Sequence, residues 1–206
     1  MNTGDRFAAL SGATGTVTGG FGLVGSRIVH KLRALGAKPL AVGRLDAWTP
    51  GRLDAYGSCV YSSVFGISPG DPDVVVGDIT DATLMHDLLS RSDYVVHAAA
   101  LADVAEYTRN PAAALEANIR GTQTVLDAAA RHSGTLRRLV FVSSASVYGV
   151  GSGNAGAPFG EGDALTPGRS TPTPSCGASI KRPWPWAVAT TVTRSCGTSP
   201  STANLR

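Results

Sequence analysis

The feature that most constrains this sequence is a set of three glycines spaced three residues apart, Gly19, Gly22 and Gly25. They lie between a β-prone run at residues 14–18 and a run with helical character at residues 23–35. Glycines in this pattern let the chain turn tightly, let backbone N–H groups approach a ligand, and let the helix pack closely on the strand. Because a helix N-terminus carries partial positive charge, the pattern predicts a cradle for the pyrophosphate of a dinucleotide. Glycine makes up 25 of the 206 residues, so an ordinary surface turn is the alternative.

Strands and helices are expected to alternate along the rest of the chain. The apolar patterns predict strands at residues 39–42, 74–78, 94–100 and 139–142, and helices at 81–89 and 111–131. Since parallel neighbours need crossover connections, this alternation predicts an α/β fold with a doubly wound parallel sheet of Rossmann type. The strand tips would then share one ligand-binding edge.

The tip of the second strand bears on the choice of cofactor. In a dinucleotide fold an acidic residue at this point binds the ribose 2′-OH, whereas an arginine accommodates a 2′-phosphate. Gly43 and Arg44 occupy the tip, with Asp46 two residues later. NADP is therefore slightly favoured over NAD; the alternative is that Arg44 is only a solvated loop charge.

Composition limits the class of protein. With 43% hydrophobic and 16% charged residues, one globular domain with or without an appendage is expected. No leader pattern opens the chain and no apolar run approaches the roughly 20 residues that span a bilayer, so a cytoplasmic location without a membrane partner is expected. Cys59, Cys176 and Cys196 form no Cys-x-x-Cys pair, and neither a disulfide framework nor a metal site is expected. The net charge of +3 arises after residue 167, and the mildly acidic remainder indicates no nucleic-acid partner.

Five motifs, in order over residues 14–149, resemble those of extended short-chain dehydrogenases/reductases of the NAD-dependent epimerase/dehydratase family. They are Thr18-Gly19-x-x-Gly22-x-x-Gly25, Gly77-Asp78-Ile79, His97-Ala98-Ala99, Asn118-x-x-Gly121-Thr122 and Val142-Ser143-Ser144-Ala145-Ser146-Val147-Tyr148-Gly149. The resemblance implies NAD or NADP as cofactor and a nucleotide-linked sugar as substrate. It also implies transient hydride transfer at a ring carbon of that sugar.

The resemblance also assigns roles to individual residues. Ser144 aligns with the catalytic hydroxyl that hydrogen-bonds the reacting sugar oxygen; the alternative is that Ser143 and Ser144 only terminate a strand. His97, flanked by valine and alanine, is interpreted as a hydrogen-bonded scaffold residue rather than a general base. The residues expected to bind the cofactor are Gly19, Phe21, Gly22, Leu23, Gly25, Arg44, Asp78, Ile79, Ala98, Ala99 and Asn118.

One part of the family pattern is missing. Family chemistry uses a Tyr and a Lys four residues apart on one helix, so that both side chains point to the same face. None of the five tyrosines has a lysine four residues later. The nearest counterpart, residues 174–181, has Cys176 in place of the tyrosine and Lys181 five positions on, which turns the lysine about 100° away on a helix. Cys176 and Lys181 are therefore interpreted as ordinary loop residues.

The C-terminal segment has a different composition from the rest. From Gly168 onward there is no Asp or Glu, Ser, Thr and Pro are abundant, and no helical or alternating pattern holds. We expect residues 1–167 to form the NAD(P)-binding domain and residues 168–206 a poorly ordered, irregular tail, with the substrate domain missing and the chain truncated after a shifted reading frame. Turnover would then be impaired. A non-catalytic NAD(P)-binding module and a steroid or carbonyl reductase of the same family are the alternatives, and a homodimer is left open.

Overall fold

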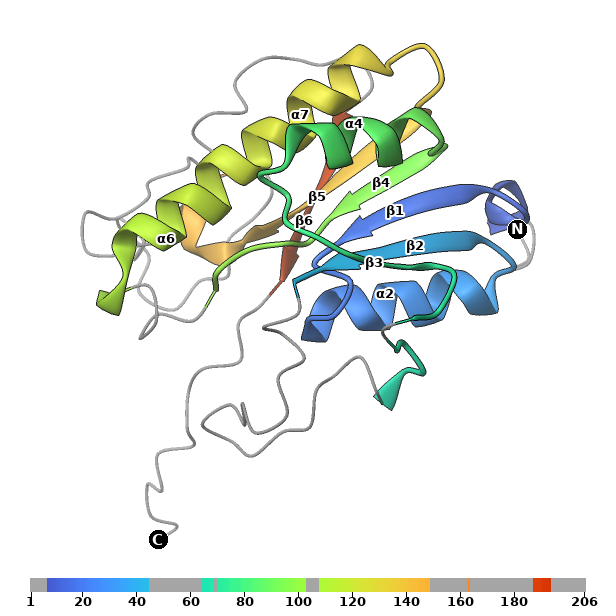
Figure 1. The fold of residues 1–206 in the computed structure, drawn as a ribbon, viewed down its shortest axis with the longest axis horizontal. Helices are drawn as coiled ribbons and strands as arrows, with labels where there is room; N and C mark the ends of the chain where they lie inside the picture. Colours follow the sequence, from blue (N-terminus) through green and yellow to red (C-terminus); the bar gives the residue numbers. More distant parts are fainter. Residues whose placement is uncertain are drawn as a thin grey trace, which may run out of the picture.

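Six parallel strands form one sheet in the order β3-β2-β1-β4-β5-β6 (Figure 1). The computed structural model describes residues 7–44, 64–68, 70–102, 108–148, 163 and 187–193. The strands are β1 (Thr14–Thr18), β2 (Lys38–Gly43), β3 (Val74–Val76), β4 (Tyr94–His97), β5 (Arg138–Ser144) and β6 (Ala187–Thr193). The strand order reverses between β1 and β4, which is the point where open parallel sheets bind ligands at their carboxyl ends.

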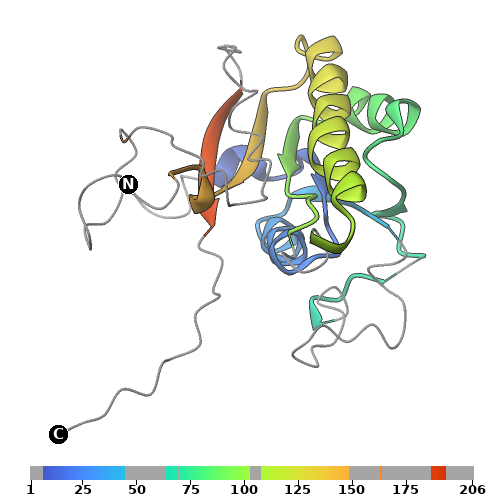
Figure 2. The same ribbon diagram turned by 90° about the vertical axis from the view of Figure 1, so that its left-hand side faces the viewer.

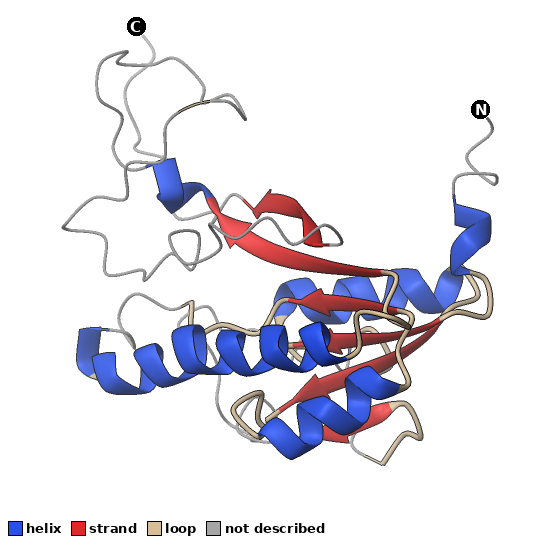
Figure 3. Ribbon diagram, turned by 90° about the horizontal axis from the view of Figure 1, so that it is seen from above, coloured by secondary structure: helices blue, strands red, loops and turns tan. Residues whose placement is uncertain are grey.

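Helices cover both faces of the sheet. Helix α2 (Leu23–Ala34) lies on one face, and α4 (Ala82–Ser90) and α7 (Thr122–Arg131) lie side by side on the other (Figures 1 and 3). Each face has its own buried cluster. On the α2 side the cluster contains Val17, Phe21, Val29, Ala41 and Ile67. On the α4 and α7 side it contains Val42, Met85, Leu88, Leu89, Val95, Val125, Ala128, Ala129 and others. The predicted doubly wound Rossmann-type sheet is thus confirmed.

Short polar side chains fix where the helices of the second face begin. Asp81 caps α4 by accepting from the N–H groups of Thr83 and Leu84 at 2.9 and 3.0 Å. Asn110 caps α6 (Pro111–Leu115) by accepting from the N–H of Ala113 at 3.1 Å. The helix predicted at residues 111–131 is present, but it contains a π-helical turn, η3 (Glu116–Gly121), between α6 and α7. Two short 3₁₀ turns, η1 (Ala8–Leu10) and η4 (Ala145–Tyr148), complete the described helical elements.

The last strand corrects one expectation from the sequence. Residues Ala187–Thr193 form β6, which pairs in parallel with β5 at the outer edge of the sheet (Figure 2). The expectation of no regular element after residue 167 is wrong for these seven residues. Most of them are valine or threonine, whose β-branched side chains favour the pleated surface beside another strand. The other residues of the predicted tail lie outside the described residues. The division of the chain into a domain and a tail therefore stays a prediction.

No helix in the part of the chain that the structure describes is long and apolar enough to cross a bilayer.

Candidate functional site

The turn between β1 and α2 can be made only by glycine at its first position. Gly19 has a φ of +68°, in the left-handed region that side chains rarely adopt. A Cβ there would also lie 2.7 Å from the backbone nitrogen of Ala99 and 2.8 Å from the carbonyl of Ala98. The turn therefore packs directly on the backbone that follows β4, and Ala98 and Ala99 form a wall beside it.

The other two glycines of the pattern differ in what the fold requires of them. A Cβ on Gly25 would run into the carbonyl of Gly19, so α2 can pack against the turn only because this side chain is absent. A Cβ on Gly22 would meet a single atom, the oxygen of Gly19, at 3.4 Å. The fold itself therefore leaves space at Gly22. That space is where a ligand could approach the backbone.

The N-terminus of α2 is arranged to bind an anion. Gly22 is the N-cap residue, no side chain caps the helix, and no acidic residue lies in its first turn. The N–H groups of a first helical turn have no partner within the helix, and they point outward with the positive end of the helix dipole. Leu23, the first helical residue, is half exposed beside this opening. Together with the glycines, these groups fit the pyrophosphate of a dinucleotide.

Phe21, which lies within the turn, faces the other way. Its side chain is 2% exposed and packs in the α2-side cluster. A Cβ on Gly43, at the tip of β2, would collide with the Phe21 ring. The ring therefore covers Gly43 from the core side, and only the backbone of Phe21 remains to contact a ligand. The prediction that Phe21 binds the cofactor stays a prediction, restricted to its main chain.

His97 links three elements beneath the turn. Its Nδ1 lies 2.6 Å from Oγ1 of Thr18, at the end of β1, and its Nε2 lies 2.9 Å from Oγ1 of Thr122, at the start of α7. The side chain is 1% exposed, and this burial lowers the pKa of His97 from 6.5 to about 4. The imidazole is therefore neutral near pH 7, with both nitrogens bonded to threonines. The interpretation of His97 as a hydrogen-bonded scaffold residue is confirmed.

The tips of β2 and β3 carry a pair of opposite charges. Arg44 Nη1 lies 3.5 Å from Oδ2 of Asp78, and both side chains are partly exposed. The other oxygen of Asp78 accepts from the N–H and the hydroxyl of Thr80, each at 2.9 Å. These bonds fix the carboxylate at the edge of the sheet. Ile79, in contrast, is 8% exposed and packs against Gly121, so its side chain belongs mainly to the core.

Asn118 positions the segment after β4. This side chain lies in the π-helical turn, where its Oδ1 accepts from the N–H of Leu101 at 2.7 Å and its Nδ2 donates to the carbonyl of Leu101 at 3.1 Å. From the other side, the N–H of Ala98 donates to the carbonyl of Thr18 at 3.1 Å. The wall of the cradle is thus held from both ends. A cofactor contact by Asn118 stays a prediction.

Ser144 is the last residue of β5. Phe141 is in register with His97, so Ser144 lies three residues further along the sheet, roughly 10 Å beyond His97. Because side chains alternate along a strand, Ser143 shares the face of Phe141 while Ser144 lies on the opposite face, where α2 packs. The register thus puts Ser144 at the same edge as the cradle, and its catalytic role stays a prediction. Cys176 and Lys181 lie outside the described residues.

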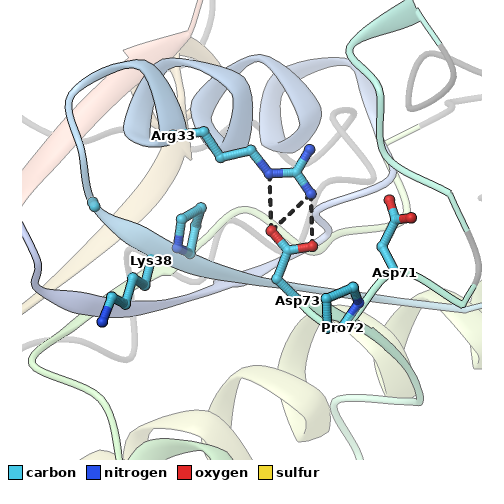
Figure 4. Close-up of a pocket in the computed structure, with 7 residues that line it drawn as sticks. Arg33, Lys38, Asp71, Pro72 and Asp73 are labelled. Atoms are coloured by element: carbon cyan, nitrogen blue, oxygen red, sulfur yellow. Dashed lines mark hydrogen bonds and ion pairs between the residues drawn. The ribbon is translucent and has the colours of Figure 1, made fainter.

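A pocket elsewhere on the molecule plays no part in this arrangement. It lies between the C-terminal end of α2 and the starts of β2 and β3, at the edge of the sheet opposite the cradle (Figure 4). Two of its charged groups are already paired, since Nε and Nη2 of Arg33 donate to the carboxylate of Asp73 at 2.9 and 2.8 Å. This pair joins α2 to the segment before β3, which is a structural role.

Comparison with known proteins agrees with a dinucleotide-binding site at the turn between β1 and α2. Residues 16–174 match the model of the NAD dependent epimerase/dehydratase family. The dTDP-glucose 4,6-dehydratase of Streptomyces antibioticus is 38% identical over 140 residues, which are 65% of this chain and 38% of that protein. The UDP-glucose 4-epimerase of Yersinia pestis is 30% identical over 135 residues, covering 65% of this chain and 37% of that protein.

Solved structures of epimerases also resemble this chain. An epimerase from Methanothermobacter thermautotrophicus has a TM-score of 0.65 and 30% identity, covering 82% of this chain and 45% of that one. The UDP-glucose 4-epimerase from Brucella ovis, solved in complex with NAD, has a TM-score of 0.57 and 30% identity over 75% of this chain and 42% of that one. The chain spans less than half the length of these relatives. The match over most of its sequence shows that it belongs to the NAD dependent epimerase/dehydratase family.

Proposed function

We propose that this chain binds NAD or NADP and that its function in the family is to act on a nucleotide-linked sugar by transient hydride transfer. The observation that carries the proposal is the contrast between Gly19 and Gly22. The fold excludes a side chain at Gly19 but leaves room for one at Gly22, so the fold alone gives no reason for a glycine there. Approach of a ligand to the backbone supplies that reason.

Different residues along the edge of the sheet would bind different parts of the cofactor. The first-turn N–H groups of α2 would bind the pyrophosphate. Arg44 and Asp78 would lie at the adenosine end, where the positive charge of Arg44 suits the 2′-phosphate of NADP. The small side chains of Ala98 and Ala99 would let the cofactor lie against the turn. When bound, the nicotinamide would accept a hydride from the sugar and return it.

The substrate end of the site would be formed by Ser144. Its hydroxyl is expected to donate a hydrogen bond to the sugar oxygen whose carbon reacts, which stabilises the charge that develops there. The names of the relatives, a dTDP-glucose 4,6-dehydratase and UDP-glucose 4-epimerases, support a sugar linked to a nucleoside diphosphate as substrate class. Which sugar is used, and what happens at its carbon, would depend on residues that read the sugar.

A second candidate is a cofactor-binding module without catalysis. It is favoured by one observation, that no tyrosine in the sequence has a lysine four residues later. Such a pair supplies the proton-transfer group of the family, and without it hydride transfer would lack its acid and base. This is also the basis for proposing that turnover is impaired in this chain. A steroid or carbonyl reductase remains the third alternative.

Binding is tested by titrating the chain with NADH and NADPH while cofactor fluorescence is followed. Gly22→Val should keep the fold, because the space at this position is open, and should lose binding, because the branched side chain displaces the ligand. Losing two hydrogen bonds to charged oxygens, at about 1.5–3 kcal/mol each, lowers affinity by at least roughly a hundredfold. Gly134→Val is the control, since a Cβ there meets nothing within 4 Å and the residue lies in the turn before β5, away from the cradle.

Unchanged affinity in Gly22→Val would remove the cradle from the proposal. Turnover is tested separately, by incubating the chain and NAD or NADP with dTDP-glucose and UDP-glucose and resolving the products by chromatography. Binding with turnover supports the enzyme; binding without turnover selects the non-catalytic module. Reduction of a steroid or simple carbonyl, with no reaction on either sugar, would select the reductase.

A further inference from the structure

Two histidines from different helices meet on the outer surface of the α4 and α7 layer, away from the cradle. His86 lies in α4, and His132 is the C-cap residue of α7, 46 positions later. Nδ1 of His86 lies 2.5 Å from Nε2 of His132. The two rings are stacked, with centroids 4.6 Å apart and planes 25° from parallel. Two imidazole nitrogens thus converge on one point from two separate segments of the chain.

The backbones that carry this pair are fixed by the core. Met85, Leu88 and Leu89 of α4 pack with Val125 and Ala129 of α7, and all five are fully buried. The backbone of His132 is held independently of the pair. Its N–H donates to the carbonyl of Ala129 at 3.2 Å, and its own carbonyl accepts from the N–H of Leu136 at 2.9 Å. The two rings are therefore presented at a preset separation, which lowers the entropic cost of binding one ligand with both.

We propose that His86 and His132 form a binding site for a divalent first-row transition ion, with Ni²⁺ and Cu²⁺ preferred. Neutral imidazole is a common ligand for these ions. Among the described residues there is no group of three or more His, Cys, Asp or Glu that could hold a metal, so water would complete the coordination. The neighbouring carboxylate, Asp87, is paired with Arg91 at 3.1 Å and is not needed as a ligand.

The separation of the nitrogens sets the preference for the ion. With metal–nitrogen bonds of about 2.0 Å, two neighbouring ligands at a right angle lie about 2.8 Å apart, whereas tetrahedral ligands lie about 3.3 Å apart. The distance between His86 Nδ1 and His132 Nε2 therefore has to increase less for ligands at a right angle than for tetrahedral ligands. His86 is exposed and His132 half-buried, so small rotations of both side chains suffice. Tetragonal or octahedral ions therefore fit better than Zn²⁺.

Binding of the ion by both facing nitrogens requires one ring to change tautomer. Without metal, the contact is a hydrogen bond in which one ring nitrogen donates to the other. For both facing nitrogens to bind the ion, that proton moves through solvent to the second nitrogen of the same ring. In that tautomer each ring presents one nitrogen lone pair to the metal.

The test is calorimetric titration of the untagged chain with NiCl₂. Ni²⁺ is the probe because the thiols of the three cysteines would reduce Cu²⁺. The double variant His86→Ala/His132→Ala gives the background from those thiols and from every other group. The wild-type chain should bind one more equivalent than this variant. Each single variant should weaken that site by at least about tenfold, or 1.4 kcal/mol.

His30→Ala is the matched control, because His30 is an exposed histidine on α2 whose ring lies tilted against Phe65 rather than beside a second histidine. It should leave Ni²⁺ binding unchanged. A second readout is thermal unfolding, since an ion that joins α4 to α7 only in the folded state should raise the midpoint in wild type and not in the single variants. The proposal is overturned if the isotherms of wild type and double variant superpose, or if His30→Ala loses as much affinity as His86→Ala.

Discussion

Burial of His97 should make the stability of this fold depend on pH in a defined window. The pKa of His97 is about 4 in the folded chain against 6.5 for the free side chain, because the imidazole is desolvated between β4 and α7. Between pH 6.5 and about pH 4, His97 is therefore protonated in the unfolded chain but not in the folded chain. The stabilisation is complete above pH 6.5, falls as the pH drops, and stops changing below about pH 4.

The size of the effect follows from the difference between the two pKa values. At 1.36 kcal/mol per unit, the full window corresponds to about 3 kcal/mol, a large share of the 5–15 kcal/mol that typically stabilises a domain. By the same linkage, the loss is about 1 kcal/mol at pH 5.5 and between about 2 and 3 kcal/mol at pH 4.5. Protonation of one residue could thus unfold a marginally stable chain.

The assay is urea unfolding followed by circular dichroism at pH 7.5, 6.5, 5.5 and 4.5, for wild type and His97→Gln. The amide of glutamine can still bond to Thr18 or Thr122 but does not titrate. His97→Gln should therefore be less stable than wild type at pH 7.5, and this deficit should shrink by about 2–3 kcal/mol by pH 4.5. Carboxylates titrate in both chains and cancel in the difference. His30→Gln should keep the wild-type slope, and a deficit of His97→Gln that stays constant across the range would refute the reasoning.

Two further predictions concern the edge of the sheet. Gly25→Ala should lower both the unfolding midpoint and cofactor affinity, because its Cβ meets the carbonyl of Gly19; the expected cost is about 1–3 kcal/mol despite the better helix propensity of alanine, and an unchanged midpoint would contradict the packing. Arg44→Ala should lower the ratio of NADP to NAD affinity measured by fluorescence titration, with little effect on stability because its pair with Asp78 is partly exposed. An unaltered ratio would show that Arg44 does not read the 2′-phosphate.

The parts of the site that the sequence predicts are those set by local backbone geometry. Two of the three glycine positions act as expected, since tight turning at Gly19 and helix packing at Gly25 depend on neighbours a few residues away, while ligand approach at Gly22 stays a prediction. Alternation of apolar runs is also enough to predict the parallel sheet from β1 to β5. His97 could be interpreted correctly because its valine and alanine neighbours indicate burial.

The parts that sequence reasoning missed depend on distant partners. The π-helical turn coincides with Asn118, whose partner Leu101 lies 17 residues earlier, and no periodicity indicates that contact. Strand β6 pairs with β5 across 48 positions, from Leu139 to Ala187, and its sequence, Ala-Val-Ala-Thr-Thr-Val-Thr, does not alternate between apolar and polar residues. Phe21 is among the residues predicted to bind the cofactor, but the pattern of the turn does not reveal that its side chain faces the core.

The packing of Phe21 over Gly43 has a consequence for redesign and for natural variation. The two positions share one volume, because the ring occupies the space that a side chain on the tip of β2 would need. We expect a larger residue at position 43 to be tolerated only with a smaller one at position 21, so the two sites should covary among homologues and show strong non-additivity in a double-mutant cycle. A variant that switches cofactor preference by replacing both Gly43 and Arg44 would therefore also need a smaller side chain at position 21, on the α2 side of β2.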